Sequence, residues 1–184
     1  VVVYHEGALR EALEVHLPRI EFYVPAYMGS SSGLEIMAKM PRLRVCQLLT
    51  AGFEGALPHI PSGVTLCNAA GVHDASTAEL AIGLMIASLR GIDDAAREME
   101  AGAWNHRSHV SLADRRVVII GAGGVGRAIS RRLGPFEVGV TLVGRSSRAD
   151  VIALPEAGAA LSEADIVVIA VPLDDSTSPL VGAT

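Results

Sequence analysis

A glycine-rich hexapeptide at residues 121–126, between an apolar strand-like run and a helix-like run, constrains the fold of this chain more than any other stretch. Gly121 allows a tight turn, Gly123 lets a pyrophosphate approach the backbone, and Gly126 lets the helix pack against the strand. The free N–H groups of the helix then face the phosphates. The hexapeptide therefore predicts a dinucleotide site, with a turn that binds nothing as the alternative. The predicted contacts are Gly121, Gly123, Gly124, Val125 and Gly126.

Short apolar runs alternate with helix-like segments along the first part of the chain. The strand-like runs are 1–3, 20–24 and 45–49, and the helix-like segments between them are 6–16 and 32–40. Such alternation predicts β-α-β units and a parallel sheet.

A second group of strand-like runs surrounds the hexapeptide, at 117–120, 138–143 and 166–171. Three strands make one half of a Rossmann-type dinucleotide-binding domain. The second half is not in the sequence, and a half-sheet leaves an edge with apolar surface and unpaired backbone. We therefore expect the chain to be a fragment, or the ordered part, of a longer protein.

The most strongly indicated helix of the chain is expected to begin at Ser76. Ser76 and Glu79 have the spacing of a capping box, and an apolar run continues from them to about Leu89. We place the domain boundary just before this helix. The predicted domains are residues 1–73 and 74–184.

Charge and composition exclude several classes of partner. The formal net charge is −5, and the sequence has no block of five or more Lys and Arg residues that would indicate a nucleic-acid surface. The longest apolar stretch, 80–89, is too short to cross a bilayer. Cys46 and Cys67 lie in strand-like runs, where they fit as small buried residues and not as a disulfide framework. We expect a soluble cytoplasmic protein that binds neither nucleic acid nor membrane.

Four passages follow one another along the chain: 48–52, 68–80, 102–104, and the hexapeptide followed by 164–173. Their order and spacing resemble those of the D-isomer-specific 2-hydroxyacid dehydrogenases, which include phosphoglycerate and formate dehydrogenases and the glyoxylate/hydroxypyruvate reductases. The resemblance covers about residues 45–182. It implies an α/β protein in which a smaller flavodoxin-like substrate domain precedes the incomplete Rossmann-type domain.

The resemblance implies a substrate site around residues 50–52. In the family the matching loop presents backbone N–H groups to the substrate carboxylate, so Ala51 and Gly52 are predicted contacts, with a plain turn as the alternative. His73 stands where the family often has an asparagine near the substrate and the nicotinamide, and a histidine can also donate a hydrogen bond. We predict it as a third contact, with a surface histidine as the alternative.

The end of the second strand of the dinucleotide unit bears on the choice of cofactor. NAD-binding units usually place an acidic residue there for the ribose 2′-hydroxyl, but this chain has Gly144. Without that carboxylate a 2′-phosphate is not repelled, and the side chains that follow can bind it: Arg145, Ser146 and Arg148. NADP is therefore the preferred prediction. NAD is the alternative, with these arginines as solvated surface charges.

The loop after the third strand is the last predicted part of the cofactor site. The resemblance implies that Val171 and Pro172 line the path of the adenosine and the nicotinamide ribose, and that Thr177 closes the loop. A proline that only begins a loop is the alternative. The catalytic Arg, Glu and His of the family come after this loop, beyond the last residue of the sequence. We predict no catalytic residue and no metal site in this chain.

Two function classes stay open. In the first, the protein is an NAD(P)-dependent oxidoreductase that acts on the CH–OH group of a small 2-hydroxy acid, working as a 2-keto acid reductase. In the second, it is a dinucleotide-sensing regulatory or scaffold protein, as the C-terminal-binding corepressors are on the same fold. The resemblance also implies a homodimer that packs through the helix at 76–89 and the segment around Trp104.

Overall fold

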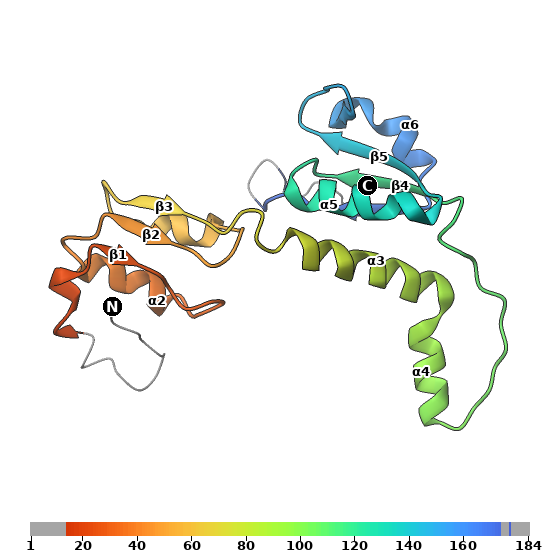
Figure 1. The fold of residues 1–184 in the computed structure, drawn as a ribbon, viewed down its shortest axis with the longest axis horizontal. Helices are drawn as coiled ribbons and strands as arrows, with labels where there is room; N and C mark the ends of the chain where they lie inside the picture. The colour runs from red at the N-terminus through yellow and green to blue at the C-terminus, as the bar shows by residue number, and fades with distance from the viewer. Residues whose placement is uncertain (1–13, 174–176, 178–184) are drawn as a thin grey trace. The chain divides into compact units, whose positions relative to one another are not determined.

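The computed structural model describes residues 14–173 and residue 177, which fall into two compact units (Figure 1). The first unit holds the described parts of Val1–His73 and Pro172–Thr184, and the second is Asp74–Val171. The strand expected at 1–3 and most of the helix expected at 6–16 lie outside the described residues.

The first unit is built on a three-stranded parallel sheet in the order β1-β2-β3. Its strands are β1 (Phe22–Tyr23), β2 (Val45–Gln47) and β3 (Thr65–Cys67). Its helical turns are η1 (Leu17–Arg19), α2 (Ser32–Glu35), η2 (Ile36–Lys39) and η3 (Glu54–His59). The expected parallel sheet is confirmed, while the single helix expected at 32–40 is an α-helical turn that continues as a 3-10 turn.

The second unit contains a four-stranded parallel sheet in the order β6-β5-β4-β7. Its strands are β4 (Arg116–Ile120), β5 (Gly139–Gly144), β6 (Val151–Ala153) and β7 (Ile166–Ile169). This order matches the first four strands of the doubly wound dinucleotide fold, which confirms the predicted class. The sequence indicates only three of these strands, because a strand as short as β6 has no readable hydrophobic period.

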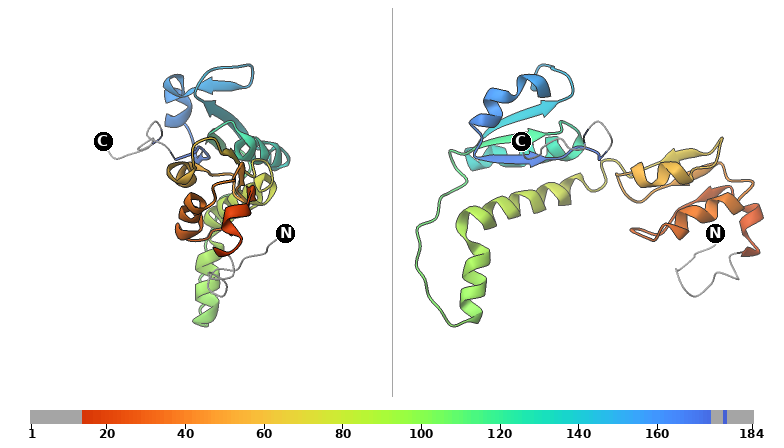
Figure 2. Two further views of the ribbon diagram at one scale, coloured as in Figure 1. Left: turned by 90° about the vertical axis from the view of Figure 1, so that its left-hand side faces the viewer. Right: turned by 180° about the vertical axis from the view of Figure 1, so that it is seen from behind.

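The second unit also contains four α-helices and two short turns. They are α3 (Asp74–Arg90), α4 (Ile92–Glu100), α5 (Gly124–Leu133) and α6 (Gly158–Ser162), with the short turns η4 (Gly134–Phe136) and η5 (Leu154–Glu156). α3 and α5 lie side by side on one face of the sheet (Figure 2). Ile82 and Ile129 of these helices join Ile119 of β4 in one buried core. The opposite face is open at β7, where Val167 and Ile169 are 45% and 54% exposed.

The start of α3 differs from the expectation. The helix begins at Asp74, so Ser76 and Glu79 lie within its first turns and the predicted capping box is wrong. Asp74 is itself favourable in a first helical turn because its carboxylate faces the positive end of the helix dipole. The helix therefore starts one half-turn earlier than the capping pattern indicates.

Gly91 separates α3 from α4. It has a φ of 60°, a left-handed conformation that favours glycine, and a Cβ atom at this position would overlap the ring of the exposed His109. The helix axes are bent by 67° at this point. In the described part of the chain no single helix has the length and apolar character to span a membrane; only the bent α3–α4 pair meets those criteria, on length and composition alone.

Candidate functional site

The turn between β4 and α5 can be made only by glycine at its first position. Gly121 has a φ of 117°, and a Cβ atom on it would overlap the carbonyl oxygen of Ala170 at the end of β7. Its N–H donates to the carbonyl oxygen of Val143 at 2.8 Å. Gly121 therefore lies where the ends of three neighbouring strands meet, β5, β4 and β7.

Gly126 allows close packing of α5 against β4, while Gly123 leaves space beside the same turn. A Cβ atom on Gly126 would overlap the carbonyl oxygen of Gly121, so α5 can begin this close to β4 only with glycine there. Gly123 is exposed, and in the described part of the chain no atom beyond its immediate chain neighbours lies within 4 Å of the position a Cβ would take. Among the described residues no side chain caps α5 at Gly123 with a hydrogen bond, so the N–H groups of its first turn keep unused donor capacity. A helix N-terminus of this kind attracts a phosphate group.

Asp74 lies at the same helix end, which the sequence does not reveal. A Cβ atom on Gly124 would overlap its carboxylate, so the carboxylate packs against the first residue of α5. An anion is favourable at this position because of the helix dipole. The contact joins residues far apart in the chain, and no local motif indicates it.

Crowding by β6 explains why no acidic side chain occupies the end of β5. A Cβ atom on Gly144 would lie 2.9 Å from Cγ1 of Val151. The exposed residues Arg145 and Ser146 follow, and Arg148 reaches back to the glycine turn, with Nη2 at 3.5 Å from the carbonyl oxygen of Ala122. The structure therefore brings Arg148 to the turn; the binding roles of Gly144, Arg145, Ser146 and Arg148 stay predictions.

An ion pair between α5 and the β5–β6 loop was missed by the sequence reasoning. Arg127 donates through Nη1 to Oδ2 of Asp150 at 2.6 Å and through Nη2 to Oδ1 at 3.3 Å. These bonds hold the pKa of the Asp150 carboxyl below its usual range. A carboxylate is thus present near the end of β5, six positions after Gly144, but it is already paired.

The chain leaves the sheet after β7 beside the glycine turn. The N–H of Ala170 donates to the carbonyl oxygen of Ile120 at 2.8 Å, and Cγ1 of Val171 would lie 3.2 Å from a Cβ on Gly121. The Thr177 hydroxyl donates to the carbonyl oxygen of Pro172 at 2.6 Å. Contact of Val171, Pro172 and Thr177 with a cofactor stays a prediction.

The predicted substrate loop follows β2 in the first unit. Each of its carbonyl groups accepts a hydrogen bond: Thr50 from the Ala69 N–H at 2.8 Å, Ala51 from Asn68 Nδ2 at 2.8 Å, and Gly52 from the Thr50 hydroxyl at 2.7 Å. No group in residues 14–173 or 177 accepts a hydrogen bond from the N–H of Ala51 or Gly52. Two adjacent N–H groups with unused donor capacity can bind a carboxylate.

His73 lies beside this loop. Its Nε2 is 3.1 Å from the carbonyl oxygen of Leu49, and its ring centroid is 5.8 Å from that of Tyr27. Because a carbonyl only accepts, Nε2 carries the hydrogen in this contact. The structure brings together Ala51, Gly52 and His73, and their contact with a substrate stays a prediction. Among the residues that the structure describes, no three His, Cys, Asp or Glu side chains are grouped to hold a metal ion.

Comparison with known proteins places this architecture in a family. Residues 82–184 match the model of the D-isomer specific 2-hydroxyacid dehydrogenase, NAD binding domain. The hydroxyphenylpyruvate reductase of Plectranthus scutellarioides is 26% identical over 174 residues, which are 86% of this chain and 54% of the relative. The glyoxylate reductase/hydroxypyruvate reductase of Mus musculus is 36% identical over 103 residues, 52% of this chain and 31% of the relative.

Solved structures agree on the fold. A D-isomer specific 2-hydroxyacid dehydrogenase family protein from Aeromonas salmonicida superposes with a TM-score of 0.79 at 23% identity, over 90% of this chain and 55% of that one. This chain spans about half the length, or less, of the curated relatives it matches. The family match covers more than half of the chain and includes the whole turn from β4 to α5. The chain therefore belongs to the D-isomer specific 2-hydroxyacid dehydrogenase family.

Proposed function

We propose that this protein is a nicotinamide-dinucleotide-dependent oxidoreductase that acts on the CH–OH group of a small 2-hydroxy acid, working as a 2-keto acid reductase. One observation carries the proposal: the chain holds an uncapped helix end at a glycine turn and, in its other unit, a loop with two unused N–H groups. The first suits a pyrophosphate and the second suits a carboxylate. A reduction of this kind needs both ligands.

The residues of the glycine turn fit a dinucleotide. Gly123 leaves room for the pyrophosphate, and the N–H groups at the start of α5 supply hydrogen bonds and a favourable dipole. When bound, the nicotinamide supplies the hydride. In the other unit, the N–H groups of Ala51 and Gly52 hold the acid's carboxylate, and this fixes the orientation of the neighbouring carbonyl. We assign no acid/base residue to this chain.

A direct assay tests the activity. We expect the intact protein to oxidise NADPH with glyoxylate, hydroxypyruvate or pyruvate as acceptor, with a kcat/KM of about 10⁴ M⁻¹s⁻¹ or above for its preferred acid. The measurement is the loss of NADPH absorbance with time. Tight dinucleotide binding without turnover of any acceptor would favour the alternative, a dinucleotide-sensing regulatory protein.

We further propose that NADP is the preferred cofactor. Three features support this preference: Gly144 provides no carboxylate to bind the ribose hydroxyls or repel a 2′-phosphate, Arg145 is exposed next to it, and Arg148 lies at the glycine turn. The carboxylate of Asp150 is neutralised by Arg127 and leaves the other two arginines available. Arginine binds phosphate with charge-assisted, often bidentate, hydrogen bonds.

Paired affinities test this preference. In the double variant Arg145→Ala/Arg148→Ala, we expect NADPH binding to weaken about tenfold or more while NADH binding changes less than about twofold, because only NADPH carries the 2′-phosphate. Arg19→Ala/Arg131→Ala is the control, since it also removes two positive charges, from an exposed position in the first unit and from one at the far end of α5. Titration of both cofactors gives the affinities. A wild-type protein that binds NADH as tightly as NADPH would contradict the proposal.

Asp74 provides a test of where the pyrophosphate binds. Its carboxylate lies at the start of α5, so a pyrophosphate there meets a like charge. We expect Asp74→Asn to tighten dinucleotide binding about fivefold to tenfold at low salt, and to lower the free energy of unfolding by about 0.3–1 kcal/mol as the helix dipole loses an anion. Glu79→Gln, on the exposed side of α3, should do neither. An unchanged affinity in Asp74→Asn would place the pyrophosphate elsewhere.

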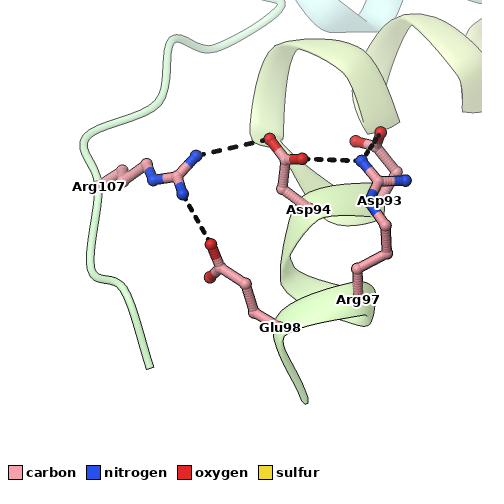
Figure 3. Close-up of polar contacts among 5 residues, drawn as sticks. All are labelled: Asp93, Asp94, Arg97, Glu98 and Arg107. Carbon is pink, nitrogen blue, oxygen red and sulfur yellow. Dashed lines mark hydrogen bonds and ion pairs between the residues drawn. The ribbon is translucent and has the colours of Figure 1, made fainter. Parts of the chain in front are cut away.

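We also propose that the protein forms a homodimer through its second unit. α4 has no buried residue, and a helix of nine residues is marginal in isolation. Arg97 pairs with Asp93 and Asp94, and Arg107 of the returning loop pairs with Asp94 and Glu98 (Figure 3). Exposed pairs of this kind contribute only about 0–1 kcal/mol each. Another surface must therefore stabilise this helix.

Exposed apolar side chains mark that surface. Those on α3, α4 and the loop after them are Leu80, Leu84, Ile92, Met99, Trp104 and Val110. We propose that the same surface of a second copy covers them, since a two-fold interface pairs a patch with itself. Trp104, at 88% exposed, contributes the largest apolar area to such an interface.

Light scattering tests the assembly. We expect the wild-type protein to have twice the mass of one chain, and Trp104→Ser to raise the dimer dissociation constant about tenfold or more. Val15→Ser is the control, because it removes an exposed apolar side chain from the first unit. A monomeric wild-type protein at micromolar concentration would contradict this proposal.

A further inference from the structure

A cavity of about 190 Å³ lies in the first unit, at the end of the sheet where β1 and β2 finish. Its walls are the loop after β1, residues 25–30, and the loop after β2, residues 48–53 without Ala51, completed by α2 and η3. Thr50 and Gly52 belong to its lining, so the cavity adjoins the carboxylate-binding N–H groups proposed above. Ligands of parallel α/β sheets bind at these strand ends.

The lining is uncharged. No Asp, Glu, Lys, Arg or His side chain is among the described residues that line the cavity, and its large apolar side chains come from both loops. They include Tyr27, Met28, Leu49 and Phe53. All four are partly exposed, between 38% and 78%, so apolar surface is available for a ligand to bury.

The loop after β1 is held in an unusual conformation. Met28 lies in a turn with a φ of 54°, a left-handed conformation that non-glycine residues rarely adopt and that recurs at ligand-binding and active sites. Tyr27 beside it contacts the ring of His73. Since His73 also donates to the carbonyl of Leu49, one side chain contacts both the loop after β1 and the loop after β2. The contacts of His73 with both loops thus help to hold the walls of the cavity in place.

The geometry points to the function of this cavity: we propose that it is the side-chain subsite of the substrate site and selects 2-keto acids with an uncharged apolar substituent, up to the size of an aromatic ring. The proposal rests on the reductase function proposed above. The substituent of such an acid begins two bonds from the carboxylate, so a carboxylate held at Ala51 and Gly52 brings it to the adjoining cavity.

Size and charge both support this selection. An apolar cavity of about 150 Å³ is large enough to bind benzene, so the volume here accommodates a phenyl group. A substituent with its own carboxylate or phosphate would lose hydration and find no cation in the lining. Leu49 and Phe53 favour an apolar group through burial, and the flexible side chain of Met28 adapts to its shape.

A series of acceptors tests the subsite in the intact protein. We expect kcat/KM to rise from pyruvate to 4-methyl-2-oxopentanoate and phenylpyruvate, by about fourfold for each methylene-sized group buried. Oxaloacetate and 3-phosphohydroxypyruvate should fall at least about a hundredfold below phenylpyruvate. Isothermal titration with phenylpyruvate and oxaloacetate measures the same preference without turnover.

A charge introduced into the cavity should reverse the preference. In Leu49→Arg, we expect kcat/KM for oxaloacetate to rise about tenfold and that for phenylpyruvate to fall about tenfold. Leu57→Arg is the matched control, because Leu57 is an exposed leucine of η3 outside the lining, and its order of acceptors should match the wild type. In Leu49→Ala, which adds no charge, we expect only one change: a smaller ratio of kcat/KM for the larger apolar acids to kcat/KM for pyruvate.

The outcomes separate the two proposals. Turnover of glyoxylate or pyruvate with oxaloacetate preferred over phenylpyruvate overturns the subsite and leaves the reductase function standing. Turnover of no acid overturns the reductase function, and the titration then decides the subsite: tighter binding of oxaloacetate than of phenylpyruvate overturns it. An unchanged acceptor order in Leu49→Arg also overturns it.

Discussion

The close approach of Gly126 to the carbonyl group of Gly121 is the contact on which the second unit depends. A side chain at either position would overlap backbone atoms, so only two glycines let α5 begin directly behind the end of β4. This contact places the start of α5 at the end of β4, and Gly121 itself adjoins Ala170 and Val171 after β7. The phosphate-binding geometry thus follows from backbone packing, which explains why one short motif constrains so much of the chain.

Charged side chains near the start of α5 already have interaction partners before any ligand binds. Asp74 supplies an anion to the N-terminus of α5, and Arg127 is engaged by Asp150. A pyrophosphate therefore exchanges an existing favourable contact for a stronger one, and its net affinity is a difference between the two. Arg148 makes one long hydrogen bond to the carbonyl oxygen of Ala122 and a weaker electrostatic interaction with Asp150, so its guanidinium is less engaged than that of Arg127 and can discriminate between cofactors.

Local patterns in the sequence predict the elements that local physics determines. The hexapeptide, the parallel β-α-β arrangement and the apolar α3 all follow from spacing within a few residues. β6 does not, because its three residues are held by pairing with β5 and not by a period of their own. The position of the Asp74 carboxylate at Gly124, the Arg127–Asp150 pair and the cavity near Leu49 join segments far apart in the chain, and only the folded structure brings them together.

The two proposed ligands are recognised by different physics. Recognition in the second unit is electrostatic: helix N–H groups and arginines act on phosphates, and exposed charges are screened at physiological ionic strength over about 8 Å. In the first unit, two N–H groups anchor the acid and an uncharged cavity takes its substituent, so most of the discrimination among acids is hydrophobic. Burial of apolar surface carries a negative heat-capacity change and is not weakened by screening. Salt therefore acts mainly on the choice of cofactor, while the shape and charge of the cavity act on the choice of acid.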